Sequence, residues 1–260
     1  MTQRELTNKL NIASIRYYNG EVSDITDTEF DLLLKKLQKM EKESGIVYSD
    51  SPTQRVGSDL QKGFGKVNHP QPMLTIENTY SHEELQEWCD KIHKEYDVEW
   101  FNVSVKYDGV SCELKYVGGE FVQASTRGDK NVGDDITLNV FGVKDIPFSL
   151  NWVFDKDEDF YVRGEILLPK SRLKGLNEER VKNKELPFAN TRNACAGSIK
   201  QLDHKITASR GLIFRPWDCF GDVELDSTQG RDIFLEKLGF KFEVKSSSIH
   251  YYDSVANVID

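Results

Sequence analysis

The chain has 260 residues, of which 38% are hydrophobic, 30% are charged and 7 are prolines, a composition that predicts a packed core and excludes a disordered segment. Its formal net charge of -9 argues against a protein that grips nucleic acid with its whole surface, because phosphate binding depends on many Lys and Arg contacts. Any contact with DNA should therefore be local or supplied by another polypeptide.

The chain carries no signal for export or for membrane insertion. It has no run of about 18 apolar residues, and its start, MTQRELTNKLNIASIRYY, is polar and amphipathic. The cysteines form no CxxC pair, which argues against a zinc ribbon and against a disulfide framework. We expect a cytoplasmic protein whose cysteines are reduced and serve in packing, namely Cys89, Cys112, Cys195 and Cys219.

Two helices are predicted at the N-terminus, over residues 4–18 and 28–44. Apolar residues recur at helical spacing in both, at Leu6, Leu10 and Ile15 and then at Phe30, Leu33, Leu34, Leu37 and Met40. Thr26 or Asp27 can cap the second helix, and Gly45 stands where a helix should end. The following residues, 49–73, are rich in Ser, Pro and Gly and are predicted to form a linker with turns.

A third helix and a series of strands are predicted further along the chain. Ser81 followed by Glu84 is a capping-box pattern that opens a helix through Ile92. Gly118-Gly119 between two stretches rich in β-formers indicates a hairpin. The predicted strands are 101–106, 111–116, 120–125, 161–168 and 212–218, and further helices are predicted near 170–182 and 230–238.

The tetrapeptide Lys106-Tyr107-Asp108-Gly109 is the first candidate for chemistry. It follows a predicted strand and precedes the hairpin, which puts an amine beside a carboxylate and a flexible glycine at the edge of a sheet. A lysine nucleophile must be neutral when it attacks, which costs about 4 to 5 kcal/mol at neutral pH unless burial or positive neighbours help. By itself KxDG is a weak signal, and a solvated lysine beside a turn aspartate fits it as well.

The surroundings of this tetrapeptide make the pattern specific. The stretch SVKYDGVSCELKYVGGEFVQASTRGDKNVGDDITLNV resembles the part of NAD-dependent DNA ligases in which KxDG is followed by TRGD and then by G-[ED]-D-[IV]-T-x-N. Further blocks agree in order and spacing, namely SDSPTQRVG, HPQPMLTIEN, VRGEILLP, FANTRNACAGSIKQLD and ITASRGL. The resemblance extends from Tyr17 to Phe240.

This resemblance implies an α+β fold and an activity. Residues 63–260 would form a nucleotidyltransferase (ATP-grasp-like ligase adenylation) domain with antiparallel sheets, and residues 1–62 a helical subdomain that binds nicotinamide mononucleotide (NMN), with a linker. Lys106 would attack the α-phosphate of NAD, form lysyl-AMP and release NMN, and the AMP would later pass to a DNA 5'-phosphate at a nick. Mg²⁺ would screen the phosphates, and no metal site made by the protein is expected.

The resemblance also implies site residues. Glu165 would hold the ribose, because a carboxylate is a good acceptor for the two hydroxyls of a diol. Three cationic side chains would approach the phosphates, namely Arg127, Arg192 and Lys200. In isolation, Glu165 and Arg192 could equally form a surface ion pair. The implied AMP-binding residues are Thr75, Ile76, Ser104, Tyr107, Asp108, Gly109, Arg127, Glu165, Arg192 and Lys200.

The helical subdomain would hold the NMN half of NAD. Asp27 and Asp31 share one helix face, with Phe30 beside them, and could receive a cationic nicotinamide ring. Without the resemblance, a solvated acidic first turn with Phe30 in the core would be the favoured interpretation. The implied NMN-binding residues are Tyr17, Tyr18, Asp27, Phe30 and Asp31.

The sequence departs from the family at several of these positions. Tyr18 replaces a histidine and Phe30 a tyrosine, which keeps the rings but removes hydrogen-bonding groups. Ser104 replaces a glutamate and Lys200 an arginine, so bidentate contacts are lost. The DGVVIK-like strand, a further lysine motif, and the OB, zinc-finger, helix-hairpin-helix and BRCT domains are not in the sequence, so we expect a truncated chain or one subunit of a split, phage-like ligase that does not seal nicks alone.

Two other functions fit parts of the pattern. ATP- or GTP-using nucleotidyltransferases share KxDG, and the N-terminal helices discriminate against them. A non-catalytic NAD-binding or scaffolding subunit fits the departures at Ser104 and Lys200. A further hypothesis is weak contact with nicked duplex DNA through LNEERVKNK and the region of Lys200.

Overall fold

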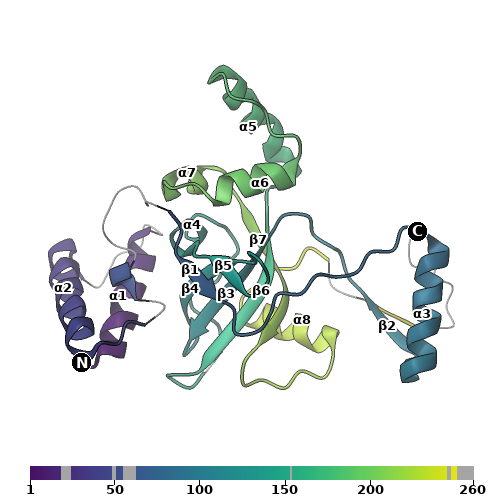
Figure 1. The fold of residues 1–260 in the computed structure, drawn as a ribbon, viewed down its shortest axis with the longest axis horizontal. Coiled ribbons are helices and arrows are strands. Elements are labelled where there is room, and N and C mark those ends of the chain that lie inside the picture. Colours follow the sequence, from purple (N-terminus) through teal and green to yellow (C-terminus); the bar gives the residue numbers. More distant parts are fainter. Residues whose placement is uncertain (19–24, 49–50, 55–62, 153, 245–246, 251–260) are drawn as a thin grey trace.

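The N-terminal helices form a unit with a hydrophobic core of its own. The computed structural model describes the chain except residues 19–24, 49–50, 55–62, 153, 245–246 and 251–260. Helices α1 (Gln3–Tyr18) and α2 (Asp27–Ser44) pack side by side, as predicted (Figure 1). The residues buried between them are Leu6, Leu10, Leu34 and Leu37, and Ile25, Phe30, Leu33 and Met40 pack against these.

Both ends of α2 are fixed by the residues that the sequence indicated. The Thr26 hydroxyl accepts from the Glu29 N–H at 3.3 Å, and the Glu29 carboxylate accepts from the Thr26 N–H at 2.9 Å. This reciprocal capping box satisfies donors that the helix itself leaves unpaired, and such a cap contributes about 1 kcal/mol. Gly45 ends the helix with a φ of 67°.

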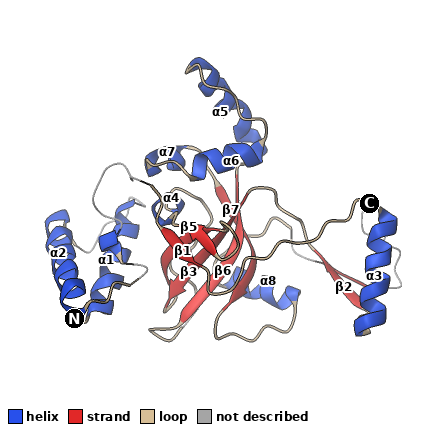
Figure 2. Ribbon diagram, in the orientation of Figure 1, coloured by secondary structure: helices blue, strands red, loops and turns tan. Residues whose placement is uncertain are grey.

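A four-stranded antiparallel sheet is the centre of the larger unit (Figure 2). Gly118 and Gly119 have φ values of 57° and 81°, so the predicted hairpin turn has the positive φ angles that favour glycine. In spatial order the strands are β4 (Glu120–Thr126), β3 (Val110–Val117), β6 (Asp159–Leu167) and β7 (Ile213–Phe220). The expected α+β class with antiparallel sheets is confirmed.

Helices cover this sheet and bury its core. Figure 1 shows α6 and α7 across one end of the sheet, with α5 projecting from them. Aromatic side chains fill much of the core, including Tyr116, Phe121, Phe160 and Phe214, which are fully buried. The helices are α4 (Thr137–Val140), α5 (Lys170–Lys182), α6 (Thr191–Ile199), α7 (His204–Ser209) and α8 (Thr228–Lys237).

A smaller unit projects from the sheet at the far side from α1 and α2 (Figure 1). Helix α3 (His82–Tyr96) lies on the two-stranded sheet of β2 (Trp100–Val103) and β8 (Ser247–His250), and the rings of Trp88 and Phe101 are 5.6 Å apart. The Ser81 hydroxyl caps α3 as predicted. The strand predicted over residues 101–106 stops at Val103, because only residues 100–103 find a partner in β8.

The predicted linker over residues 49–73 contains regular structure. A short 3₁₀ helix, η1, spans Pro52–Gln54, and β1 (Lys66–Asn68) pairs antiparallel with β5 (Val132–Asp134). The prediction of a linker with turns was therefore wrong for residues 66–68. Their hydrogen-bonding partner lies far along the sequence, so the local composition did not indicate a strand.

All four cysteines are buried and unpaired, as expected for packing residues. The Cys195 thiol donates to the carbonyl of Ile166 at 3.0 Å, and burial raises its pKa to about 12. Burial also raises the pKa of Cys112 well above its ordinary value. Burial thus disfavours the reactive thiolate form of both residues, which agrees with a packing role.

Candidate active site

Lys106 lies in the loop that joins the small sheet to the central sheet. β2 ends at Val103 and β3 begins at Val110, so the KYDG residues span the step between the two sheets. Lys106 is exposed, whereas Gly109 is buried. The loop thus presents the amine to solvent while its far end is fixed in the central sheet.

Glu165 on β6 receives two hydrogen bonds from this far end of the loop. The Gly109 N–H donates to Oε1 at 3.1 Å and the Ser111 hydroxyl donates to Oε2 at 2.8 Å. Burial raises the pKa of the Glu165 carboxyl, and the two hydrogen bonds oppose that rise. Each oxygen keeps a further lone pair, so the ionised carboxylate can also accept from a diol.

Gly109, just before β3, lies close against β6. A Cβ added there would stand 2.1 Å from the carbonyl oxygen of Ile166, 2.7 Å from Leu167 Cδ2 and 3.1 Å from Glu165 Cγ. No side chain fits in this space without moving the backbone of β6. The glycine of KYDG is therefore required by a close approach of two strands.

Arg192 approaches the same loop from α6. The Asn190 side chain caps this helix by accepting from the Asn193 N–H at 2.8 Å. The Arg192 Nη1 donates to Asp108 Oδ1 at 2.7 Å, and this bond raises the pKa of the guanidinium. Both side chains are more than half exposed, so the pair contributes little to stability. Arg192 can therefore exchange Asp108 for a phosphate at small cost.

Lys200 ends the same helix and is bound by a carboxylate. Its amine donates to Asp134 Oδ2 at 2.6 Å, and Lys66 on β1 donates to Asp134 Oδ1 at 2.5 Å. The bonds from Lys200 and Lys66 lower the pKa of Asp134. A phosphate that recruits Lys200 must compete with Asp134.

The other expected AMP-binding residues have fewer side-chain contacts in the structure. Arg127 follows β4, and its N–H donates to the Ser111 carbonyl at 3.2 Å. Tyr107 is partly buried, which raises its pKa, and Ser104 is exposed. Thr75 and Ile76 lie in an exposed segment between β1 and α3. Among the described residues, no hydrogen bond links Ser104, Thr75 or Ile76 to Lys106 or Glu165.

The expected NMN-binding residues are divided between the two N-terminal helices. Tyr17 and Tyr18 form the last turn of α1, and Asp27 is the first residue of α2. The Asp31 side chain is exposed, whereas Phe30 is partly buried against the core of the helical pair. The carboxylate of Asp31 can thus reach a ligand more easily than the ring of Phe30.

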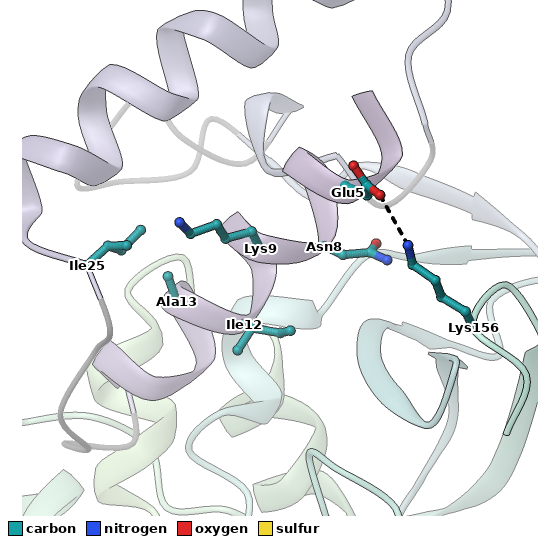
Figure 3. A pocket seen from close by; sticks show the side chains of 7 residues that line it. All are labelled: Glu5, Asn8, Lys9, Ile12, Ala13, Ile25 and Lys156. Atoms are coloured by element: carbon teal, nitrogen blue, oxygen red, sulfur yellow. Dashed lines mark hydrogen bonds and ion pairs between the residues drawn. The ribbon is translucent and has the colours of Figure 1, made fainter. Parts of the chain in front are cut away.

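A cavity of about 330 Å³ lies between α1 and the turn before β6 (Figure 3). Lys156 in this turn donates to Glu5 of α1 at 3.2 Å and connects the helical pair to the larger unit. The cavity is lined by Glu5, Asn8, Lys9, Ile12, Ala13, Ile25 and Lys156. None of the expected site residues whose side chains the structure describes lines it.

Sequence reasoning missed three residues at the candidate site. Ser111 shares the Glu165 carboxylate with Gly109, and the alternation of side chains along a strand puts residues two apart on one face. Asp134 lies within the GDD stretch that was quoted for the resemblance, but its role as partner of Lys200 had no local signal. Asn190, which caps the helix of Arg192, was recognisable as a good capping residue.

The structure defines an α+β protein with a lysine-bearing loop at its central antiparallel sheet and a helical N-terminal region. Residues 61–260 match the family model described as the NAD-dependent DNA ligase adenylation domain. Residues 2–57 match the model described as the DNA ligase-like, N-terminal NAD+-binding domain. The chain belongs to the NAD-dependent DNA ligase family.

Curated relatives agree with this assignment. The chain is 38% identical to a DNA ligase of Bacillus subtilis and to a DNA ligase of Caldicellulosiruptor saccharolyticus, each over 98% of the chain and 38% of the relative. It is 40% identical to a DNA ligase of Thermodesulfovibrio yellowstonii over 84% of the chain and 32% of the relative. The chain thus spans less than two fifths of the length of these relatives. In the part of the chain that the structure describes, no helix is long and apolar enough to span a membrane.

Proposed function

We propose that this chain is the adenylation component of an NAD-dependent DNA ligase, with Lys106 as the nucleophile. The observation that carries the proposal is the arrangement around the KYDG loop. It combines an exposed amine at Lys106, a carboxylate at Glu165 that accepts from the Gly109 N–H, and an exposed guanidinium at Arg192. Such a set provides a nucleophile, an acceptor for a ribose and a cation for a phosphate.

In the proposed step, Lys106 Nζ attacks the α-phosphorus of NAD. A P–N bond forms, the P–O bond to NMN breaks, NMN leaves with the bridging oxygen, and the amine loses its proton to solvent. Arg127, Arg192 and Lys200 would stabilise the charge that develops on the α-phosphate. Mg²⁺ would screen the phosphates while bound to them. AMP would then pass from Lys106 to the 5'-phosphate of nicked DNA.

We propose the remaining site residues on the same basis. Glu165 would accept from the ribose hydroxyls, and Asp108 and Gly109 would shape the loop. Thr75, Ile76, Ser104 and Tyr107 would line the adenine. In the helical unit, Tyr17, Tyr18, Asp27, Phe30 and Asp31 would hold NMN, with the exposed Asp31 as the charged partner of the nicotinamide ring.

We also propose a division into residues 1–62 and 63–260. The two hydrophobic clusters, one between α1 and α2 and one around the central sheet, are separate, which supports this boundary. The two family models meet near it, at residues 57 and 61. Nicked duplex DNA would be engaged mainly through additional domains or a second ligase subunit, and the proposed activity suits a cytoplasmic location.

Intact-protein mass after incubation with NAD and Mg²⁺ tests the proposal. A gain equal to AMP is expected with NAD and none with ATP, because only NAD carries the NMN group that the helical unit would bind. No gain from NAD would overturn the proposal. A gain from ATP alone would instead identify an ATP-using nucleotidyltransferase.

Replacing Asp31 with alanine is expected to slow adduct formation from NAD about ten- to hundredfold, because one charge-assisted contact with NMN is lost. Asp31 is exposed, so the fold should not change. The measurement is the rate of mass gain as a function of NAD concentration. Glu43→Ala, at the other end of the same helix and also exposed, is the matched control. Equal rates for both variants would rule out the NMN role of Asp31.

The proposed role of Glu165 predicts an acid limb in the pH profile. The ribose would be held by the ionised carboxylate, and burial raises the pKa of Glu165 above the ordinary value for glutamate. As the pH drops through this raised pKa, adduct formation should therefore fall more steeply than protonation of Lys106 alone would cause. Glu165→Gln should form the adduct more slowly at neutral pH and should lack this acid limb. Its free energy of unfolding should not decrease, because burial disfavours the ionised carboxylate that the variant removes. Persistence of the limb in the variant would contradict this role.

A further inference from the structure

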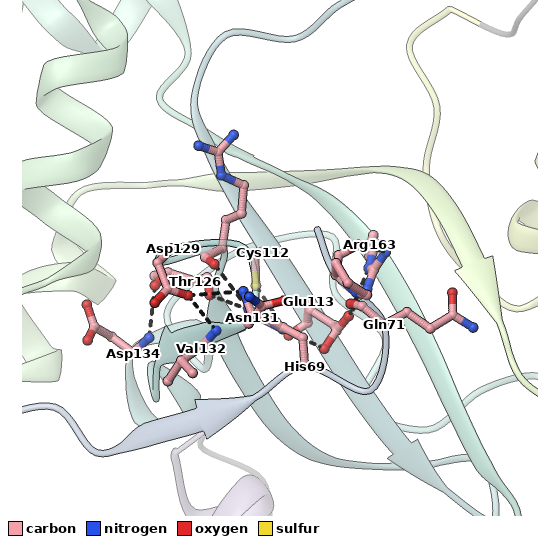
Figure 4. A network of polar contacts seen from close by, with 12 residues as sticks. His69, Gln71, Cys112, Glu113, Thr126, Asp129, Asn131, Val132, Asp134 and Arg163 are labelled. Atoms are coloured by element: carbon pink, nitrogen blue, oxygen red, sulfur yellow. Dashed lines mark hydrogen bonds and ion pairs between the residues drawn. The ribbon is translucent and has the colours of Figure 1, made fainter. Parts of the chain in front are cut away.

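A buried network of charged groups lies next to the candidate site and has no part in the chemistry proposed so far (Figure 4). Its centre is Glu113 on β3, whose carboxylate accepts from Arg163 Nε on β6 at 2.8 Å and lies 2.9 Å from His69 Nδ1. The side chains of these three residues are at most 7% exposed. Burying three ionisable groups is costly unless each is fully paired.

The partners of His69 require its ring to be charged. Nδ1 faces the Glu113 carboxylate, and Nε2 faces the carbonyl oxygens of Thr126 at 3.1 Å and Arg127 at 3.2 Å. All of these are acceptors, so both ring nitrogens must donate. The other oxygen of the Glu113 carboxylate accepts from Arg163. The network is therefore an imidazolium and a guanidinium that share one carboxylate.

This network holds a strap, defined here as residues 69–73, against the central sheet. Arg163 donates to the carbonyls of Gln71 and Pro72. The backbone N–H groups of His69 and Met73 donate to the carbonyls of Asn131 at 2.8 Å and Lys130 at 2.9 Å. The strap leads directly into Thr75 and Ile76. The same ring faces the backbone carbonyl of Arg127, so His69 contacts one proposed phosphate-binding residue and lies in the segment that leads to two proposed adenine-binding residues.

We propose that His69 is a positioning residue for NAD, whose imidazolium fixes the strap and the Arg127 backbone in the arrangement that binds the AMP half. This inference rests on the proposed function. His69 would contact no ligand itself. Its loss should therefore change the affinity for NAD more than the rate of the chemical step.

Because His69 is charged, the stabilisation of the strap should depend on pH in a definite direction. Burial lowers the pKa of His69, but the hydrogen bond and charge of Glu113 and the two carbonyls outweigh burial, so the pKa is raised above 6.5. The stabilisation is thus complete below the unfolded pKa and is lost as the pH rises through the folded one. The charged group that contacts the ring is Glu113 on β3, which in turn contacts Arg163 on β6. In the neighbouring turn and β5, the carboxylate of Asp129 accepts from the Val132 N–H and that of Asp134 is paired with Lys200 and Lys66.

The first test compares His69→Gln with His82→Gln, a change of an exposed histidine on α3. The readout is KM for NAD, taken as the NAD concentration that gives half the maximal rate of adduct formation. The maximal rate, written kcat here, also depends on the attacking amine. In the wild type, KM should rise at alkaline pH as His69 loses its charge. His69→Gln is expected to raise KM about tenfold at neutral pH, to show no further rise at alkaline pH, and to change kcat less. His82→Gln should match the wild type. An unchanged KM in folded His69→Gln would overturn the inference.

A second variant keeps the inference testable if His69→Gln does not fold. Glu113→Gln keeps an acceptor for Arg163 but removes the charge beside His69, so the alkaline rise in KM should move to lower pH. Nuclear magnetic resonance should show the His69 ring titrating above 6.5 in the wild type and lower in Glu113→Gln. A neutral His69 ring in the wild type at pH 6.5 would overturn the inference.

Hydrogen exchange of the strap separates this inference from the proposed function. Amide protection of residues 69–76 should be lower in Glu113→Gln than in the wild type. In the wild type, this protection should also decrease as His69 loses its proton, by more than the general effect of pH on amide exchange. This result is expected even if NAD gives no covalent adduct, which would refute the proposed function alone. Unchanged protection in Glu113→Gln would refute the positioning role.

Discussion

Replacing Lys106 with arginine is expected to abolish the AMP adduct, slowing its formation by roughly 10⁴-fold or more, as for the loss of other enzymatic nucleophiles. Arginine keeps the positive charge but does not lose its proton in proteins, so it cannot attack phosphorus. The exposed loop position has room for the larger head group. The measurement is the intact mass after incubation with NAD and Mg²⁺.

Calorimetry on the same variant distinguishes a catalytic role from a scaffold. If Lys106 is only the nucleophile, Lys106→Arg should bind NAD within a few-fold of the wild-type affinity while forming no adduct. Lys170→Arg, at an exposed position on α5, is the matched control and should form the adduct normally. An adduct on Lys106→Arg would place the nucleophile elsewhere. Wild-type protein that binds NAD without forming any adduct would favour a non-catalytic NAD-binding or scaffolding subunit.

Local signals in the sequence predicted much of the secondary structure. The capping box of Thr26, the left-handed Gly45 and the Gly118-Gly119 turn involve residues close together in the chain, so their chemistry can be read directly. The four strands of the central sheet also alternate or carry β-formers strongly enough to be recognised. The α+β class followed from these signals together with the resemblance.

Contacts between distant segments were beyond local reasoning. β2 stops at Val103 because its partner is β8, near the other end of the chain. His69 and Glu113 are 44 residues apart in sequence, and each alone looks like an ordinary polar residue. The strand β1 is only three residues long and depends on β5. Such features follow from tertiary packing, which overrides local propensity.

The departure at Lys200 acquires a physical meaning in the structure. A lysine offers a single compact charge, and here that charge is bound to Asp134, which Lys66 also neutralises. An arginine could hold a carboxylate and a phosphate with different nitrogens at the same time. Lysine at this position can give a phosphate only its remaining N–H donors on one nitrogen, so the bidentate contact of an arginine is lost while Lys66 also neutralises Asp134.

Replacing Gly109 with alanine is expected to have the second largest effect, because it changes the loop and the strand pairing together. The added Cβ would lie 2.1 Å from the Ile166 carbonyl, so β3 and β6 must separate at this point. Separation would break the bond from Gly109 to Glu165 and misplace Lys106. We expect adduct formation to fall at least about a hundredfold, as catalytic geometry is lost, and stability to fall by about 1 to 3 kcal/mol.

Alanine variants of two other glycines serve as controls that distinguish the loss of stability in Gly109→Ala from its loss of adduct formation. Gly175→Ala on α5 has nothing within 4 Å and should stabilise the protein by about 0.5 to 1 kcal/mol. Gly142→Ala would meet Ala208 at 2.5 Å, where α4 packs on α7, so it should destabilise the fold while leaving the KYDG loop intact. Urea unfolding and intact mass should therefore show that Gly142→Ala, where still folded, forms the adduct and Gly109→Ala does not. Equal adduct rates in these two variants would mean that Gly109 matters only for stability.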